Sequence, residues 1–483
     1  MKLRELLEGV DVISVNADLD MEVSGVACDT RKLQPGELFV AVVGYATDGN
    51  RFIPKAKELG AKVVVSAHPC QEDIPSVLVS SDRLALARIG ANFFGHPADS
   101  MKLVGVTGTN GKTSATILLK HILETTIGAK VGLVGTMENY IGQEVIPTDR
   151  TTPESLELQR LFARMRDAGC TYAIMEVSSH SIALNRIKGL HYEVCGFTNL
   201  TEDHLDFHKT MESYAEVKSR LFGRCNKAVI NADDVWAETM IQAAKGPVLT
   251  TSNGGKADLR AEDVELGADG IRYTAVYGEK SADVQVGIPG KFTVYNTLTS
   301  LGLALQLGIS LEDAANALKS AKGVKGRVEV VPTPTKPYTV IIDYAHTPDG
   351  MDNILSTTKS FCKGRLITVF GCGGDRDPIK RPIMGKIATD IADFVVFTSD
   401  NTRTEDPNKI LQDILAGVDK DKKNYAVVVN RPEAIRYAMD IGQKDDIIVL
   451  AGKGHETYQE VFGVKHHLDE REVIRDYLAE TEN

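Results

Sequence analysis

The sequence predicts an α/β protein built from three domains. Its 483 residues are too many for one ordinary hydrophobic core, and 43% of them are hydrophobic, which is ample for several packed domains. Short apolar runs alternate with helical patterns along most of the chain, which is typical of parallel sheets covered by helices. We place the domains at residues 1–100, 101–330 and 331–483. The boundary near residue 331 is marked by closely spaced prolines from Pro332 to Pro337, because these oppose both helix and central strand.

The first domain is predicted to be a small α/β domain. Its apolar runs indicate strands at residues 38–43, 62–65 and 76–79, and a helical pattern covers residues 82–94. Within it, the stretch Asp29-Thr30-Arg31 indicates only a polar turn when it is considered alone.

A glycine-rich loop opens the second domain. An apolar strand at residues 103–107 runs into Gly108-Thr109-Asn110-Gly111 and then into a helix that begins Lys112-Thr113-Ser114. Such a turn directs successive backbone N–H groups toward one point, where the helix N-terminus also favours negative charge. Lys112 would supply a point charge for phosphate oxygens, and the Thr113 hydroxyl a magnesium ligand. The usual phosphate-loop pattern has glycine where this chain has Val106, so a tight turn with an exposed lysine is the alternative.

The strands that follow the loop end in polar residues. Residues 131–134 and 172–177 flank a predicted helix at 153–168, and their apolar runs are typical of parallel strands buried on both faces. Ligands of such sheets lie beyond the carboxyl ends of the strands, which places Glu176 beside the loop. His204 follows the next strand. An acid and a histidine at strand ends are more often surface or capping residues, but magnesium-dependent phosphoryl transfer needs oxygen ligands, and Glu176 and Thr113 suit it.

The remainder of the chain predicts a meander and a third domain. Residues 256–290 alternate and are rich in turns, which indicates a β-meander. The third domain is predicted to be Rossmann-like, with strands at residues 339–342, 366–370, 394–397, 426–429 and 447–450. Its glycines at 371–374 do not match the spaced-glycine dinucleotide fingerprint, which argues against a dehydrogenase. Four polar clusters at strand ends predict a substrate face: residues 343–346, 375–377, 400–403 and 452–456.

Charge and cysteine usage exclude several classes of protein. The formal charge of −11 argues against general affinity for nucleic acid. Seven scattered cysteines without a CxxC pair indicate reduced thiols rather than disulfides or a zinc site. The N-terminus does not read as a signal peptide and no apolar run is long enough to span a bilayer. We therefore expect a cytoplasmic monomer without a membrane segment.

Several motifs resemble those of the Mur ligases. The loop from Gly108 to Thr113 resembles theirs residue for residue, and also that of the folylpolyglutamate synthetases. Segments 28–41, 199–204 and 218–222 resemble Mur ligase segments that hold a nucleotide sugar and a second magnesium ion. The motifs together cover nearly the whole chain and resemble the branch that joins UDP-N-acetylmuramoyl-L-alanyl-D-glutamate to a diamino acid in peptidoglycan synthesis, using ATP and forming an acyl phosphate. The central domain is then a P-loop ATPase domain between a UDP-sugar-binding domain and an amino-acid-binding domain.

The resemblance implies roles for residues that are unremarkable alone. Lys218 would otherwise be a solvated lysine on a helix, and Asn296 and Arg327 a helix cap and a linker residue. In the family, the matching lysine is carbamylated, which turns a cation into an anionic metal ligand. The implied ATP contacts are Gly108, Thr109, Asn110, Gly111, Lys112, Thr113, Ser114, Asn296, Arg327 and Asp343. The implied catalytic residues are Lys112, Lys218, Arg327 and His346. The implied ligands of two magnesium ions are Thr113, Glu176, His204 and carbamylated Lys218.

The resemblance also implies two substrate sites. For the UDP-muramoyl peptide the matching residues are Thr30, Thr151, Thr152, Ser178 and Arg186, although the Thr151-Thr152-Pro153-Glu154 stretch is also a helix-start signature. For the diamino acid they are Arg376, Asp400, Asn401, Thr402, Arg403, Gly452 and Glu456. The family signature Asp-Asn-Pro-Arg for meso-2,6-diaminopimelate has Thr402 in place of proline here. Arg403 could bind the extra carboxylate with two parallel hydrogen bonds, so we expect diaminopimelate, with L-lysine as the alternative.

Two other functions compete with this interpretation. A folylpolyglutamate synthetase shares the loop but begins close to it, whereas about a hundred residues precede Gly105 here. A non-enzymatic ATP-dependent switch protein would hydrolyse or exchange nucleotide without needing an amine.

Overall fold

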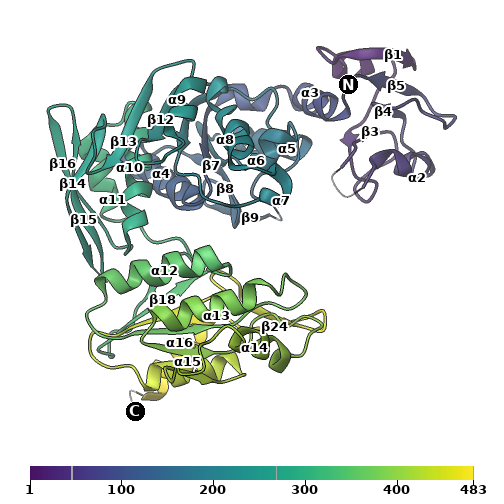
Figure 1. Ribbon diagram of the computed structural model, residues 1–483. Helices are drawn as coiled ribbons and strands as arrows, with labels where there is room; N and C mark the ends of the chain where they lie inside the picture. Colours follow the sequence, from purple (N-terminus) through teal and green to yellow (C-terminus); the bar gives the residue numbers. More distant parts are fainter. Residues whose placement is uncertain (45–46, 149, 268, 482–483) are drawn as a thin grey trace. The chain divides into compact units, whose positions relative to one another are not determined.

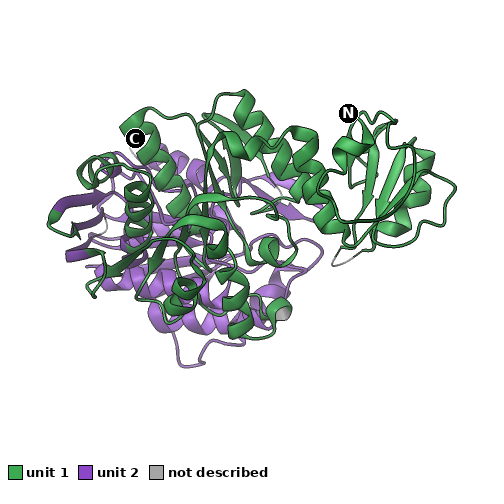
Figure 2. Cartoon of the chain, turned by 90° about the horizontal axis from the view of Figure 1, so that it is seen from above, with its two compact units in different colours: residues 1–260, 276–280, 295–317 green, residues 261–275, 281–294, 318–483 purple. Residues whose placement is uncertain are grey.

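The computed structural model describes residues 1–44, 47–148, 150–267 and 269–481, and it confirms the α/β fold class. The chain forms two compact units. Unit 1 comprises residues 1–260, 276–280 and 295–317, and unit 2 comprises residues 261–275, 281–294 and 318–483 (Figure 2). Within the described residues, no helix combines the length and apolarity needed to cross a bilayer.

The start of unit 1 is a five-stranded sheet with helices against it (Figure 1, purple). The sheet order is β1-β5-β4-β3-β2, and only the pairing of β1 with β5 is antiparallel among its described strands. The predicted helix and strands are confirmed within two residues at their ends. The bounds are α1 Leu3–Leu6, β1 Val12–Asn16, β2 Val26–Ala27, β3 Leu38–Ala41, α2 Ile53–Glu58, β4 Val63–Ser66, β5 Ser76–Val79 and α3 Asp82–Phe94.

Local sequence explains where α3 begins and ends. The Ser81 side chain accepts a hydrogen bond from Leu84 N at 3.4 Å, which caps the first turn. Gly95 follows the helix with φ +69°, the left-handed conformation that ends many helices. The strand β1 was missed because four of its five residues are exposed, so it lacks a buried face that would show as alternation.

The largest sheet of unit 1 places β6 among parallel neighbours. Strand β6 belongs to an 11-stranded sheet in which the strands from β13 onward have the order β13-β12-β11-β6-β10-β7-β8-β9; the first six of these run parallel, and the β8–β9 hairpin continues antiparallel. Glu176 lies opposite Val106, and Phe197 lies opposite Thr107, so the carboxyl ends of β10, β6 and β11 meet at one edge. The bounds are β6 Lys102–Thr107, β7 Val131–Val134, β8 Glu138–Ile141, β9 Glu144–Pro147, β10 Tyr172–Glu176, β11 Tyr192–Phe197, β12 Cys225–Asn231 and β13 Val248–Asn253.

Helices and a three-stranded segment complete this part of the chain. The helices are α4 Lys112–Ile127, α5 Ser155–Asp167, α6 Ser179–Ala183, α7 Leu205–His208, α8 Met211–Ser219, α9 Ala237–Ala243, α10 Lys291–Gln306 and α11 Leu311–Leu318. The strands β14 Leu259–Gly267, β15 Gly270–Tyr277 and β16 Lys280–Val286 neighbour one another in chain order. This confirms the meander predicted for residues 256–290, except at Ala268, which lies outside the described residues.

Unit 2 ends in a six-stranded sheet with the order β17-β18-β22-β19-β20-β21. Only β17 is antiparallel to its neighbour among the described strands of this sheet. All five strands predicted for the third domain are confirmed. The one predicted at residues 426–429 begins and ends slightly earlier than predicted. The strands are β17 Glu329–Val331, β18 Thr339–Asp343, β19 Leu366–Phe370, β20 Phe394–Phe397, β21 Tyr425–Val427 and β22 Ile447–Ala451, with a β23 Tyr458–Val461 and β24 Val464–His467 hairpin.

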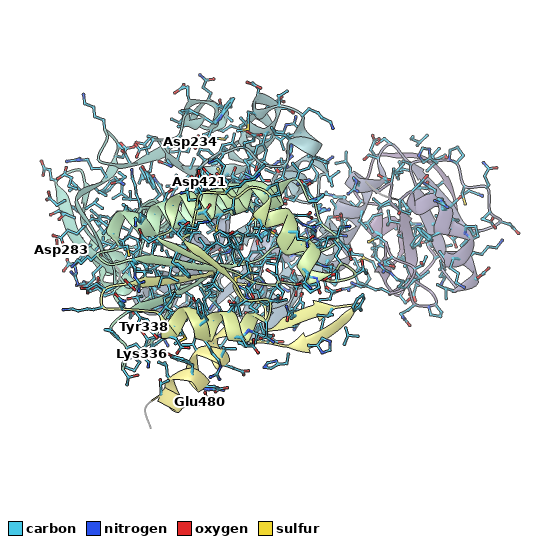
Figure 3. All side chains as sticks on the ribbon, turned by 60° about the horizontal axis from the view of Figure 1, so that its bottom comes forward. Asp234, Asp283, Lys336, Tyr338, Asp421 and Glu480 are labelled. Carbon is cyan, nitrogen blue, oxygen red and sulfur yellow. The ribbon has the colours of Figure 1, made fainter. Side chains whose placement is uncertain are left out.

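Helices cover both faces of this sheet. Two separate hydrophobic clusters pack on it: α12, α13 and α14 contribute to one cluster, and α15 and α16 to the other (Figure 1). On the α15–α16 side, Arg436 Nη2 donates to Glu480 Oε1 at 3.0 Å; Glu480 is labelled in Figure 3. The bounds are α12 Pro348–Phe361, α13 Lys380–Ile391, α14 Pro407–Leu415, α15 Arg431–Asp440 and α16 Glu470–Thr481.

Candidate active site

The glycine-rich loop joins β6 to α4 as predicted. Gly111 has φ +84° and directly precedes α4, and a Cβ at this position would overlap Asn296 Oδ1. A Cβ on Gly108 would similarly overlap Thr198 Oγ1. Glycine is therefore required at both positions by close approach as well as by conformation. The contact also brings Asn296, which is buried, directly against the loop, as its predicted role requires.

Lys112 folds back over the loop. Its Nζ donates to Gly108 O at 2.9 Å and to Thr109 O at 2.8 Å, and the side chain is half-buried. The alternative of a tight turn with an exposed lysine is therefore wrong. Thr109 N and Asn110 N donate to Asn199 at 2.8 and 2.9 Å, so it is the Lys112 ammonium group at the start of α4 that suits an anionic ligand.

Glu176 is the polar centre of this edge of the sheet. It is 0% exposed, and its Oε2 accepts hydrogen bonds from Thr113 Oγ1 at 2.9 Å and Thr136 Oγ1 at 2.8 Å. Its Oε1 accepts from Thr136 N at 2.9 Å. Thr136 was not among the predicted site residues. It follows β7, so the strand-end rule that identified Glu176 could have found it.

Thr113 and Glu176 place two oxygens side by side, and oxygen is the ligand type that magnesium prefers. Thr113 Oγ1 and Glu176 Oε2 are 2.9 Å apart, an ordinary hydrogen-bond distance. No group of three or more His, Cys, Asp or Glu side chains in the described part of the chain is arranged to hold a metal.

His204 lies in a different group of side chains. It is exposed, with φ +54°, and its Nε2 is 3.3 Å from Asp203 Oδ2. Its ring centroid lies 5.0 Å from that of His180 and 6.4 Å from that of Tyr214. Among the described residues, no hydrogen bond or ion pair joins His204 to Glu176.

Lys218 is buried beneath the loop. It is 1% exposed, its Nζ donates to Gly108 O at 2.8 Å, and the same nitrogen lies 4.7 Å from the Tyr214 ring centroid. The alternative of a solvated lysine is therefore wrong. Burial, and secondly the charge of Lys112, hold the pKa of Lys218 well below its usual range, while Asp203 opposes this shift. The two lysines share one carbonyl acceptor.

Four of the five residues predicted for the UDP-muramoyl peptide gather next to Glu176. Thr152 Oγ1 donates to Glu176 O at 2.8 Å and accepts from Ser178 N at 3.1 Å. Thr151 Oγ1 lies 3.1 Å from Thr136 Oγ1, and Arg186 Nη1 donates to Thr152 O at 3.1 Å.

Burial lowers the pKa of Arg186, and Glu154, whose Oε1 lies 2.8 Å from Arg186 Nε, opposes that shift. Thr30 lies in the polar turn that the sequence indicates, where Asp29 accepts from Arg31. No contact of the described residues joins Thr30 to the other four.

The remaining residues predicted for ATP lie in unit 2, at the end of β18. The Asp343 carboxylate accepts from Val328 N at 2.9 Å and Ala345 N at 2.8 Å. Burial raises the pKa of Asp343, and Arg327 opposes the shift. The Arg327 guanidinium lies 5.1 Å from the Tyr344 ring centroid, and His346 Nδ1 is 2.8 Å from Tyr344 O. Arg327, Asp343 and His346 therefore form one group.

The acidic residues predicted for the diamino acid share a buried lysine. Glu456 Oε2 accepts from Asn401 Nδ2 at 2.8 Å and from Lys453 Nζ at 3.2 Å. Lys453 is 0% exposed and also lies 3.7 Å from Asp400 Oδ1. A Cβ on Gly452, which has φ +113°, would lie 2.8 Å from Asp400 Oδ2. Two carboxylates around one ammonium leave a net negative charge, which suits a substrate ammonium. Sequence reasoning did not assign a role to Lys453.

Arg376 and Arg403 flank the glycine loop that follows β19. A Cβ on Gly373 would lie 3.0 Å from Arg403 Nη1 and 3.9 Å from Arg376 Cγ. Arg403 Nη1 donates to Gly374 O at 2.7 Å, and Arg403 Nε lies 3.4 Å from Glu460 Oε2. Thr402 is buried beside them. The structure thus brings together the residues predicted for the diamino acid.

Comparisons with known proteins identify the family of this chain. The chain matches the Mur ligase family, catalytic domain, over residues 22–97, the Mur ligase middle domain over residues 106–304, and the Mur ligase, glutamate ligase domain over residues 326–454. The chain belongs to the Mur ligase family, and it is an ATP-dependent ligase that forms an amide bond.

Its relatives are similar over their whole length. A UDP-N-acetylmuramoyl-L-alanyl-D-glutamate--2,6-diaminopimelate ligase of Clostridium botulinum is 46% identical, covering 95% of this chain and 96% of that protein. The ligase of the same name from Clostridium tetani is also 46% identical, covering 99% and 100%. A solved structure with that enzyme name has a TM-score of 0.76 at 32% identity, covering 100% and 99%. A folylpolyglutamate synthase of Mycobacterium tuberculosis, at 18% identity and a TM-score of 0.62, shares the fold.

Proposed function

We propose that this chain joins meso-2,6-diaminopimelate to UDP-N-acetylmuramoyl-L-alanyl-D-glutamate, with ATP as the energy source. The observation that carries the proposal is the pairing, in unit 2, of a net negative cluster with two guanidinium groups. Glu456 and Asp400 around Lys453 suit an ammonium group, and Arg403 with Arg376 suits a carboxylate. Diaminopimelate carries both groups at its distal end, whereas lysine lacks the carboxylate. The names of the relatives support the same substrate.

The reaction has two steps. An oxygen of the substrate glutamate carboxylate attacks the γ-phosphorus of ATP, and the bond to the ADP oxygen breaks, which gives an acyl phosphate and ADP. The diaminopimelate amine then attacks the acyl carbon, inorganic phosphate leaves, and the amine loses a proton. Lys112 and Arg327 offset the charge of the phosphoryl group, and His346 stays a predicted catalytic residue beside Arg327. Preorganised charge of this kind supplies most of the rate enhancement in phosphoryl transfer.

Thr113 and Glu176 would hold one magnesium ion, and the adjacency of their oxygens beside the loop supports this assignment. Bound magnesium would neutralise negative charge on the phosphate oxygens. His204 and a carbamate on Lys218 remain the proposed ligands of a second ion. Carbamate formation requires the neutral amine, and the burial of Lys218 next to Lys112 favours that form. We also retain the cytoplasm and a monomeric state as proposals, based on composition.

The test is an assay of the purified chain with ATP, magnesium, UDP-muramoyl dipeptide and one amino acid at a time. We expect phosphate release and an amide product, identified by its mass, with diaminopimelate and far less with lysine. Turnover with folate substrates would favour the folylpolyglutamate synthetase alternative. Phosphate release that is independent of any amine would favour a switch protein, and a preference for lysine would overturn the choice of amino acid.

The magnesium assignment has its own measurement. The magnesium concentration that gives half-maximal rate should rise at least about ten-fold in Glu176→Gln, because a charged ligand is lost. His204→Ala tests the second ion in the same way. Unchanged titration curves in both variants would remove these residues from the metal sites.

A further inference from the structure

Two turns of unit 2 touch along their backbones. We name residues 326–329 the Arg327 turn and residues 452–456 the Glu456 turn. A Cβ on Gly326 would overlap His455 N and lie 2.7 Å from Gly454 Cα. A Cβ on Gly454 would in turn lie 2.8 Å from Gly326 O. Neither turn can therefore shift at this point without displacing the other.

The ring of Tyr344 provides a second contact between the two turns. The Arg327 guanidinium carbon lies 5.1 Å from the centroid of the Tyr344 ring, which is a cation–π geometry. The His455 ring centroid lies 5.0 Å from the same centroid, with 41° between the two ring planes. One aromatic ring thus contacts the side chain that we assign to the phosphoryl group and the turn that carries Glu456.

Arg471, at the start of α16, donates hydrogen bonds to both turns. Its Nε donates to Glu329 Oε1 at 2.8 Å and its Nη2 donates to Glu329 Oε2, so the two side chains form a bidentate pair. The same Nη2 donates to Gly454 O at 3.1 Å, and Nη1 donates to Asp469 Oδ1 at 3.0 Å. Only 18% of the Arg471 side chain and 23% of the Glu329 side chain are exposed, so solvent screens this pair less than a surface ion pair.

The Arg327 turn has a strained backbone that its surroundings must hold. Val328 has φ +47°, which is uncommon for any residue other than glycine and rarer still for a β-branched one. Two carboxylates hold the turn: Val328 N donates to Asp343 Oδ2 at 2.9 Å, and Gly326 N donates to Glu329 Oε2 at 2.6 Å. The second carboxylate is the one that Arg471 binds. Loss of the Arg471 guanidinium would therefore loosen one of the two anchors of the strained turn.

We propose that Arg471 is a positioning residue that fixes the Arg327 turn and the Glu456 turn relative to each other, and so couples the phosphoryl-binding group to the amino-acid-binding group. The inference rests on the proposed function, because that function assigns Arg327 to the phosphoryl group and Glu456 to the substrate ammonium. The acyl phosphate and the attacking amine must meet in one geometry, since a small misplacement of reacting groups slows a reaction greatly. A guanidinium that holds both turns meets this requirement within unit 2.

The first test measures the steady-state kinetics of Arg471→Met, which removes the guanidinium and keeps an unbranched side chain. We expect kcat to fall about ten-fold and the KM for diaminopimelate to rise about ten-fold, as for the loss of hydrogen bonds to a charged group. The KM for the UDP-muramoyl dipeptide should stay as in the parent, because the residues proposed for that substrate lie in unit 1. Arg471→Lys keeps the charge but not the two parallel hydrogen bonds, so it should recover only part of both losses.

The matched control is Arg436→Met. Arg436 also pairs with a glutamate of α16 through two guanidinium nitrogens, which donate to the two carboxylate oxygens of Glu480, and this pair joins α15 to α16. The control should leave kcat and both KM values unchanged. Glu329→Gln is an independent variant of the proposed link, because it keeps an oxygen that can accept from Gly326 N but loses the charge. It should shift kcat and the KM for diaminopimelate in the same directions as Arg471→Met.

Three outcomes would contradict this expectation. If Arg471→Met lowers the melting temperature but keeps the parent's kcat and KM values, Arg471 has only a structural role and the proposal is wrong. A change in kcat alone, or in the KM for diaminopimelate alone, would show that the two turns are not coupled and would also overturn it. A parent that is inactive with diaminopimelate would instead overturn the proposed function.

Amide hydrogen exchange tests the coupling without any substrate. The probes are Gly326 N and Val328 N in the Arg327 turn, and Glu456 N, which donates to Lys453 O at 2.9 Å in the Glu456 turn. All three should exchange faster in Arg471→Met than in the parent, and at the parent's rate in Arg436→Met. Unchanged exchange in Arg471→Met, or faster exchange in only one of the two turns, would overturn the proposal whatever substrate the protein uses.

Discussion

The phosphate loop in unit 1 and the two loops after β19 and β20 in unit 2, residues 371–376 and 398–406, are built by different means. In unit 1, backbone conformation and close approach define the site: Gly108 and Gly111 leave no space for a Cβ, and neutral threonine hydroxyls surround Glu176. In unit 2, buried charges define it, with Arg381 bound to Glu405 and Asp413, and Lys453 between Glu456 and Asp400. The first site depends on the absence of a Cβ at two glycines, and the second depends on paired charges.

The difference follows from the ligands that we propose. A triphosphate is recognised mainly through its oxygens, which backbone N–H groups at a helix start can bind whatever the neighbouring side chains are. Diaminopimelate and lysine differ by a single carboxylate, so discrimination between them needs a charged side chain held in a fixed position. Holding such a charge near the protein interior requires counter-charges, because an unpaired buried charge is costly. If this is right, the two regions should respond differently to the removal of a charged side chain and to a methyl group added at a glycine.

The largest effect is expected at Lys218, the buried lysine that donates to Gly108 O of the phosphate loop. Lys218→Ala should lower kcat at least about a hundred-fold, since removal of one group that stabilises transition-state charge has this order of effect. Short carboxylates added to the assay should restore part of the rate by replacing the carbamate. Lys256→Ala, at an exposed lysine, is the control. A Lys218→Ala variant as active as the parent would exclude the residue from the site.

Gly111 tests the dependence of the phosphate loop on space. Gly111→Ala places a methyl group against Asn296 Oδ1 at φ +84°, so the KM for ATP should rise about ten-fold or more and the melting temperature should fall. Gly128→Ala is a matched control, since Gly128 also has a left-handed φ, +59°, but nothing lies within 4 Å of its Cβ position. If both variants bind ATP equally well, close approach to Asn296 does not shape the loop.

The sequence predicted the local parts of both sites, but not the pairs of distant residues that complete them. Local patterns revealed the loop glycines, Lys112 and Glu176 at the end of β10, because neighbouring residues encode backbone geometry. The contacts of Glu176 with Thr136 and of Asn401 with Glu456 join residues 40 and 55 positions apart, and no local pattern encodes such pairs. Lys453 was therefore seen within a polar cluster but not as the partner of two acids. Arg381, which lies between two predicted strands, gave no sign in the sequence of its burial.

A substitution of Arg403 tests whether the unit 2 site depends on charge. Arg403→Ala should lower the ratio of kcat/KM for diaminopimelate to kcat/KM for lysine about ten- to a hundred-fold, because a charged hydrogen-bonding partner of the extra carboxylate is lost. Arg436→Ala removes an arginine of the same unit that pairs with Glu480 on α16, and it should leave the ratio unchanged. An Arg403→Ala variant that keeps the parent's preference would show that another group, such as Arg376, selects the substrate.

The smallest effect concerns stability and again involves Lys218, which is buried beneath the phosphate loop. Burial holds the pKa of Lys218 well below its value in the unfolded chain. Between these two pKa values the unfolded state binds more protons than the folded state, so this lysine makes the free energy of unfolding increase as pH rises through that window. Below the pKa that Lys218 has in the folded chain, its burial lowers the free energy of unfolding by the full amount. Above the pKa that it has in the unfolded chain, this effect is absent. Lys218→Met removes the ionisable group while keeping an unbranched side chain, so its unfolding free energy should rise less steeply with pH than the parent's. The measurement is denaturant unfolding at a series of pH values up to about 10, without added bicarbonate or metal, with Lys256→Met as the control that should keep the parent's slope. A parent and Lys218→Met with parallel pH profiles would mean that Lys218 is not held as a neutral amine, and the electrostatic argument for its carbamylation would fail with it.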